Sequence, residues 1–110
     1  MKFYKLKLYG KTFKVYPVRK QYEEGKRLAI PLITNKGEVF SILTTNLPDQ
    51  KLSNKTNCAF VDTNNNEFAE QFIQENNLGE PTGLMGFSGF CVYPEYRFDL
   101  SKLYEEEDID

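Results

Sequence analysis

Ser88 lies in a glycine-rich stretch, Gly86-Phe87-Ser88-Gly89, where a serine hydroxyl could be exposed as a nucleophile. A serine nucleophile needs an adjacent base, which is usually histidine, and this chain contains no histidine. Lysine is the alternative base, and that alternative stays open. The same glycines do not form a phosphate-binding loop, because no Gly-Lys-Ser/Thr motif is present and aromatic, strand-like sequence follows them. We therefore assign no catalytic residue.

Oxygen-bearing side chains gather over residues 62–67, with possible calcium ligands at the first, third and fifth positions. A calcium loop requires glycine at its sixth position and glutamate at its twelfth, where this sequence has Glu67 and Ile73. Turn and helix-cap chemistry explains the cluster better. Zinc is excluded because two cysteines and no histidine cannot complete a tetrahedral site. We predict neither a metal site nor any other cofactor site.

Cys58 and Cys91 lie far apart, each on a predicted strand. In a reducing compartment we expect both to be small buried hydrophobic residues, and a disulfide between them is the alternative. No stretch approaches the roughly 20 apolar residues that span a bilayer. The N-terminal residues alternate lysine with apolar side chains and lack the continuous hydrophobic core of a signal peptide. We therefore expect a cytoplasmic protein that does not bind membranes.

The predicted strands are residues 3–9, 12–16, 27–34, 38–44, 58–62 and 84–98. Gly10-Lys11 and Asn35-Lys36-Gly37 are typical turns between paired strands. Pro31 cannot donate a ladder hydrogen bond, so its strand should be an edge or carry a bulge there. Gly86 and Gly89 predict a bulge or a strong bend within the last strand.

A single amphipathic helix is predicted over residues 65–77. Asn64 or Asn65 should cap its start, with Glu67 completing a pattern like a capping box after Asn64. Gly79 should end it in a left-handed conformation. The apolar face of the helix consists of Phe68, Ala69, Phe72 and Ile73.

Together these elements predict one α+β domain over residues 1–104. We expect a curved antiparallel sheet of about six strands with the helix packed on one face. Residues 105–110 are acidic and should form a frayed tail.

Tyr93, Glu95 and Arg97 alternate along the last predicted strand, so their side chains should project from the same face. Tyr96 and Phe98 should point into the core from the other face. Tyrosine and arginine are favoured anchors of protein interfaces. If the row lies on an open face of the sheet, it forms a polar-aromatic surface suited to a protein partner. An ordinary strand face is the alternative.

Charge is unevenly distributed along the chain. Residues 1–36 carry +8 from ten basic and two acidic residues, and residues 37–110 carry −10 from four basic and fourteen acidic residues. A basic face could bind nucleic acid, with Lys5, Lys7 and Lys14 of the N-terminal hairpin as the contacts. The alternative is a basic hairpin that pairs laterally with acidic strands and an acidic tail. A sequence pI near 5.2 and the absence of a standard nucleic-acid-binding motif favour that alternative.

A run of short motifs in the last two-thirds of the chain resembles a known family. The motifs are Thr45-Asn46-Leu47-Pro48, Asp62-Thr63-Asn64-Asn65, Phe72-Ile73, Asn77-Leu78-Gly79, Pro81-Thr82-Gly83, Ser88-Gly89-Phe90 and Tyr93-Pro94-x-Tyr96-x-Phe98. Together they resemble the family called domain of unknown function 4313. The resemblance implies small α+β proteins of bacterial conjugative elements, plasmids and phages. It implies no established activity, so no functional residue is carried over, and the basic N-terminal hairpin lies outside it.

From these patterns we predict a non-catalytic accessory protein of a bacterial mobile element. It should bind another protein through the row at residues 93–97. A nucleic-acid-binding accessory protein that uses the N-terminal lysines is the alternative, and a small enzyme is the third possibility. The identity of the partner and the oligomeric state are left open.

Overall fold

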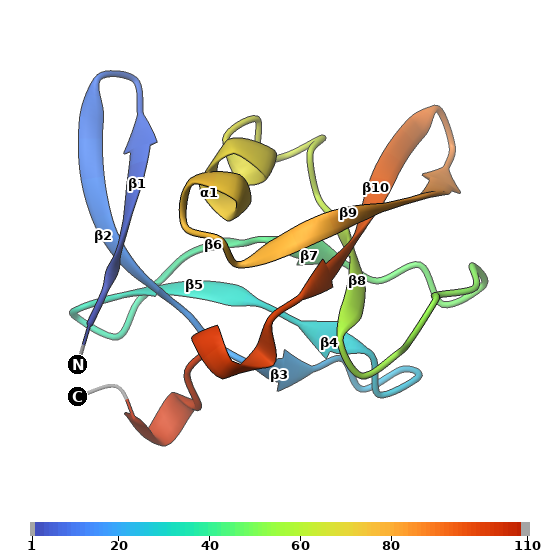
Figure 1. Cartoon of the computed structure of the whole chain (residues 1–110), viewed down its shortest axis with the longest axis horizontal. Helices are drawn as coiled ribbons and strands as arrows, with labels where there is room; N and C mark the ends of the chain where they lie inside the picture. Colours follow the sequence, from blue (N-terminus) through green and yellow to red (C-terminus); the bar gives the residue numbers. More distant parts are fainter. Residues whose placement is uncertain (1, 109–110) are drawn as a thin grey trace.

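The computed structural model describes residues 2–108, with the side chains of residues 2–107 (Figure 1). The strands are β1 (Tyr4–Leu8), β2 (Lys11–Pro17), β3 (Lys20–Gln21), β4 (Leu28–Ala29), β5 (Pro31–Thr34), β6 (Val39–Ile42), β7 (Thr44–Thr45), β8 (Cys58–Val61), β9 (Gly79–Ser88) and β10 (Cys91–Phe98). The helices are α1 (Ala69–Glu75) and the short 3-10 helices η1 (Leu100–Lys102) and η2 (Glu106–Asp108). In this described part of the chain, no helix has the length and apolar composition of a membrane span.

The α+β class with one α-helix is confirmed, but the prediction of a single curved sheet of about six strands is wrong. The described strands form two four-stranded sheets, in the orders β1-β2-β5-β6 and β7-β8-β10-β9, and a small β3-β4 pair. Every pairing between these strands is antiparallel.

The chain passes from the small β3-β4 pair into one large sheet at Ile30, and from that sheet to the other large sheet at Leu43. Both residues are fully buried. Leu43 N donates to Ile30 O at 2.9 Å, and Asp62 N donates to Leu43 O at 2.9 Å, so hydrogen bonding continues around the corner. Pro31, the first residue of β5, has no N–H to continue a straight ladder. The predicted strands over residues 27–34 and 38–44 are therefore each divided in two.

One continuous hydrophobic core joins both large sheets to α1. Phe72 and Ile73 on the predicted apolar face of the helix are buried in it, as predicted. Tyr96 and Phe98 of β10 are buried in the same core, which confirms their predicted inward orientation. Figure 1 shows α1 lying against the N-terminal part of β9.

The start of α1 differs from the prediction. Its N-cap is Phe68, with no side-chain capping bond, so the capping box proposed for Asn64 is wrong. The Asp62 carboxylate instead accepts hydrogen bonds from Asn65 N at 3.1 Å and from Asn65 Nδ2 at 2.9 Å. The asparagine-rich segment therefore forms a side-chain-stabilised turn before the helix begins.

The end of α1 also differs from the prediction. Asn77 takes the left-handed conformation with φ 53°, and Leu78 N donates to Ile73 O at 3.0 Å, as in a Schellman motif. Gly79 is not the cap but the first residue of β9. A Cβ there would lie 2.5 Å from Arg97 O, so glycine is needed because β10 approaches closely.

The predicted strand over residues 84–98 is a hairpin. Gly89, with φ 59°, and Phe90 form a two-residue turn, and Ser88 pairs with Cys91 across it. Positive φ at the first central residue alone is typical of a type II′ turn. The bulge predicted at Gly86 and Gly89 is therefore wrong, since Gly86 pairs in register with Tyr93 and Gly89 lies in the turn. The β9–β10 register shifts instead between Pro94 and Tyr96.

The C-terminal segment packs beside the end of β2. Val18 and Tyr104 form a parallel bridge, and Lys20 Nζ lies 2.6 Å from a Glu106 carboxylate oxygen. The predicted frayed tail covers residues 105–110. Its first part contains η2, and residues 109–110 lie outside the described residues.

Candidate functional site

The predicted partner-binding row does not form an exposed surface. Glu95 is 0% exposed and Tyr93 is 8% exposed, whereas Arg97 is exposed. Glu95 and its neighbour Tyr96 are both buried although their side chains leave opposite faces of β10, so this strand is covered on both sides. The prediction that the row lies on an open face is therefore wrong at two of its three residues.

Glu95 is buried because a polar loop folds over it. Its carboxylate accepts hydrogen bonds from Ser53 N at 2.7 Å, Ser53 Oγ at 2.6 Å and Thr82 Oγ1 at 2.5 Å. Burial alone raises the pKa of the Glu95 carboxyl, but the bonds from Ser53 and Thr82 and the charge of Arg97 outweigh burial and hold the pKa below its ordinary value. Glu95 is thus an ionised anchor that fastens the loop around Ser53 to the sheet.

Tyr96 makes the corresponding connection to the helix on the other face. Its hydroxyl donates to Glu70 Oε1 at 2.7 Å and accepts from Gln74 Nε2 at 3.0 Å. Burial and the bond to the Glu70 carboxylate raise the pKa of Tyr96. Because the polar atoms of both Glu95 and Tyr96 are satisfied within the protein, neither group is positioned for acid–base catalysis.

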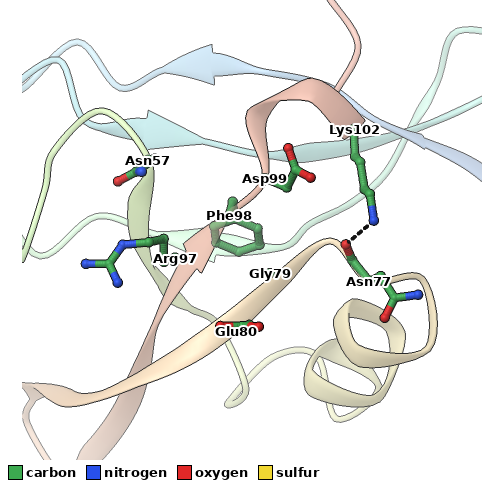
Figure 2. A pocket seen from close by; sticks show the side chains of 8 residues that line it. All are labelled: Asn57, Asn77, Gly79, Glu80, Arg97, Phe98, Asp99 and Lys102. Carbon is green, nitrogen blue, oxygen red and sulfur yellow. Dashed lines mark hydrogen bonds between the residues drawn. The ribbon is translucent and has the colours of Figure 1, made fainter.

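A hollow of about 440 Å³ lies between β9, β10 and η1. Figure 2 shows the side chains that line it. At one side of it Lys102 Nζ donates to Asn77 O at 2.8 Å (Figure 2). The Asp99 carboxylate accepts from Ser101 N and Oγ. Its residues are Asn57, Asn77, Gly79, Glu80, Arg97, Phe98, Asp99 and Lys102. This set contains no serine, cysteine or histidine, so the hollow offers no nucleophile with a base.

The remaining candidates for chemistry are isolated. The Ser88 hydroxyl is exposed at the end of β9, and no base bonds to it in residues 2–107. Cys58 and Cys91 are free cysteines, and burial raises the pKa of the Cys58 thiol, which favours the unreactive thiol form. The described residues also contain no cluster of three or more histidine, cysteine or carboxylate side chains that could hold a metal.

The three lysines of the predicted nucleic-acid contact do share one face. Lys5 pairs directly with Lys14, Lys7 pairs with Thr12, and all three lysines are exposed. Lys14 Nζ lies 4.6 Å from the centre of the Phe3 ring on this face. Like charges placed directly opposite are mildly destabilising, so this face carries positive charge at some cost to the fold.

The most unusual surface is one that sequence reasoning missed, the distal part of the β9–β10 hairpin. Its exposed apolar residues are Leu84, Met85, Phe87, Phe90 and Val92. Phe87 is 57% exposed, and Phe90 at the turn is fully exposed at 107%. Figure 1 shows this hairpin reaching beyond α1, with its turn at the outer edge of the molecule. We call these five side chains the hairpin patch.

Backbone geometry explains why Met85, Phe87 and Val92 of the hairpin patch face outward. A Cβ on Gly86 would lie 2.7 Å from Leu47 Cδ1 and from Phe60 Cε1, so the Gly86 side of the hairpin is closed by packing. Met85 and Phe87 point to the opposite side because side chains alternate along a strand. Val92 is the cross-strand partner of Phe87 and joins them there.

A signal for the hairpin patch is present in the sequence. Residues 81–94 carry no charged side chain, and Glu80 and Glu95 stand immediately outside this stretch. Phe87 and Phe90 lie close to Gly89, which is the glycine of the turn. A long uncharged strand predicts burial, so the exposure of these side chains could be recognised only once the structure showed the hairpin.

The fold and this surface define a small α+β domain with a projecting apolar hairpin. The family model described as domain of unknown function 4313 (DUF4313) matches residues 18–110, and the chain belongs to that family. The matched region starts immediately after β2, so it includes the hairpin patch and leaves out the lysine face of β1 and β2. Neither a curated protein nor a solved structure is significantly similar to the chain.

Proposed function

We propose that the chain is a non-catalytic, protein-binding accessory protein of a bacterial mobile element, and that the hairpin patch is its binding surface. The observation that carries the proposal is the exposure of five apolar side chains on the distal part of one hairpin, where residues 81–94 carry no charge. With about 200 Å² for one fully exposed aromatic side chain, the exposed area of the patch is on the order of 500 Å². Apolar patches of this size on monomeric proteins are often functional.

The polar groups support a non-catalytic role. Glu95 and Tyr96, which are the buried titratable groups of β10, are each bound by other side chains of the protein. Their positions strengthen the fold around the base of the hairpin. A hairpin anchored at its base has an advantage for binding, because less order must be gained on association.

The experiment compares three tagged proteins as baits in a bacterial lysate, with and without nuclease treatment. The first is the unaltered chain and the second is the double variant Phe87→Thr/Phe90→Ser. Threonine preserves strand propensity, and serine suits the position after Gly89 in the turn. The matched control is Tyr9→Asn, because Tyr9 is 88% exposed at the turn of the other hairpin and has a φ of 52° that asparagine tolerates.

We expect proteins that are retained by the unaltered chain and by Tyr9→Asn but lost from Phe87→Thr/Phe90→Ser. Both variants should fold normally, since exposed substitutions usually change stability by no more than about 0.5 kcal/mol. Equal recovery on all three baits contradicts the assignment of the patch. Recovery that disappears with nuclease points to nucleic acid instead.

A second candidate function, nucleic-acid binding, is favoured by the common exposed face of Lys5, Lys7 and Lys14. Fluorescence anisotropy with a labelled single strand tests it. Each lysine–phosphate contact contributes about 0.7 to the slope of log affinity against log salt concentration, so replacing all three by glutamine should reduce the slope by about 2. An unchanged slope excludes these lysines as the contacts.

A further inference from the structure

We propose that the partner of the hairpin patch is a second copy of this chain, which pairs along the outer edge of β9 to form a symmetric dimer. This inference rests on the proposed function, because it names the occupant of the same surface.

The first argument is that β9 has an edge without a strand partner in the described part of the chain. β9 is the last strand in the order β7-β8-β10-β9, and it is ten residues long. The two-residue turn makes Ser88 and Cys91 a hydrogen-bonded pair, so the backbone groups of Phe87 and Met85 point away from β10. Outward N–H and C=O groups of an edge strand are a template for another strand.

The outer edge of β9 is only weakly protected at Phe87. Phe87 N donates to Gln50 Oε1 at 3.4 Å, which is long for a hydrogen bond and comes from the end of a flexible side chain. This bond confirms that the Phe87 amide faces outward. A pairing strand would replace the glutamine oxygen with a backbone carbonyl.

The second argument is charge. In a two-fold symmetric interface the same surface is used by both copies, so charged residues near the axis meet their own counterparts and repel. The chain carries a formal net charge of −2 with 30 charged residues, yet residues 81–94 contain none. Natural edge strands usually carry a charge or a proline that prevents such pairing. In β9 these are Glu80 and Pro81 at its start, and residues 82–88 carry neither.

The third argument is the continuity of the apolar surface. Antiparallel pairing of two β9 edges about a two-fold axis places the two patches side by side on one face of a continuous sheet, so apolar side chains beside the edge pack against their counterparts across the axis. A single patch covered by lipid has less support. Attachment to an anionic membrane usually combines apolar insertion with basic residues, and the hairpin has no lysine or arginine between residues 81 and 94.

Sedimentation equilibrium of the purified chain, from about 1 µM to about 500 µM, tests this proposal over the range of weak to moderate affinities. We expect the mass to rise with concentration from 12.8 kDa toward twice that value. Phe90→Ser should weaken dimerisation at least about tenfold, as expected for an aromatic interface anchor. Met85→Lys, which adds a charge to the patch beside the β9 edge, should do the same, whereas Tyr9→Asn should have no effect.

Phe90→Ser cannot fail by unfolding the protein, since this side chain is fully exposed, and it therefore keeps the test valid if Met85→Lys does not fold. A chain that stays at 12.8 kDa throughout overturns the dimer, while a different protein recovered in the pull-down would still support the proposed function. If Phe90→Ser and Met85→Lys both still dimerise, the dimer interface proposed here is wrong. The pull-down then tests separately whether the hairpin patch binds a protein. A chain that does not dimerise but binds neutral phosphatidylcholine vesicles, with Phe90→Ser abolishing that binding, overturns the dimer in favour of lipid.

Discussion

Phe87 and Val92 lie directly opposite each other across the β9–β10 hairpin, yet they are 57% and 45% exposed. They occupy a non-hydrogen-bonded position, where opposing side chains come closest, so the two form one continuous apolar surface. In β8 of the same sheet all four residues are buried. The sheet is therefore a core element at its centre and an open apolar surface at its distal end.

Glu95→Gln should lower the free energy of unfolding by about 1–3 kcal/mol, because the buried carboxylate accepts three hydrogen bonds. A glutamine would present N–H groups toward donors from Ser53 and Thr82. Urea denaturation at neutral pH measures the loss. An unchanged midpoint would show that the loop around Ser53 does not depend on Glu95.

The contribution of Glu95 should also depend on pH with a defined sign. Its pKa in the folded protein lies below its ordinary value of about 4.3, so the unfolded chain takes up the proton more readily. The stabilisation is complete above about pH 4.3 and is lost as the pH falls through the lower folded-state pKa. Melting curves should therefore show a difference between the unaltered chain and Glu95→Gln that is constant at neutral pH and narrows in acid. A difference that widens in acid contradicts this assignment.

Gly79→Ala should destabilise the protein by about 1–3 kcal/mol, because the new Cβ would lie 2.5 Å from Arg97 O. Asn77→Gly should be neutral or slightly stabilising, since Asn77 holds the left-handed position with φ 53°. Chemical denaturation of both variants checks the pair. The reverse order would place the helix cap at Gly79 after all.

Phe72→Ala should cost about 3–5 kcal/mol, because Phe72 is a buried aromatic residue that joins α1 to the core. Gln71→Ala, on the exposed side of the same helix, is the matched control and should stay within about 0.5 kcal/mol. Circular dichroism during urea unfolding gives both values. Similar losses for the two variants would contradict the packing of α1 described above.

Chelator and reductant should leave the melting temperature unchanged. Cys58 and Cys91 are free, and the described residues provide no group of metal ligands. Differential scanning calorimetry with and without each reagent tests this expectation. A large decrease with the chelator would reveal a stabilising metal, and a large decrease with the reductant would reveal a disulfide.

The sequence predicts those parts of the fold in which one local pattern decides the outcome. Alternation places Lys5 and Lys7 on one face of β1, and helical spacing buries Phe72 and Ile73. Both patterns depend on the geometry of a single element, so they survive without knowledge of the rest of the chain.

The predictions that fail depend on contacts between distant segments. Alternation indicates which face of β10 carries Tyr93 and Glu95, but not that a polar loop from residues 50–57 covers that face. Gly89 reads as a bulge because apolar residues continue on both sides of it, and only the pairing of Ser88 with Cys91 reveals a turn. The hairpin patch was hidden for the same reason.

Amide hydrogen exchange at Met85 tests most directly whether protein covers the hairpin patch. Its N–H points away from β10 and should exchange quickly in dilute solution. Lys7 has the same outward position on β1, the edge strand of the other sheet, and serves as the internal control. If the patch is the interface between two copies, raising the concentration from about 5 µM to about 500 µM should slow exchange at Met85 at least about tenfold. Lys7 should be unaffected, and Phe87→Thr/Phe90→Ser should abolish the change. A contradicting result is exchange at Met85 that stays fast both at high concentration of the chain and after addition of any protein recovered by the pull-down. That result would contradict a protein-binding role for the hairpin.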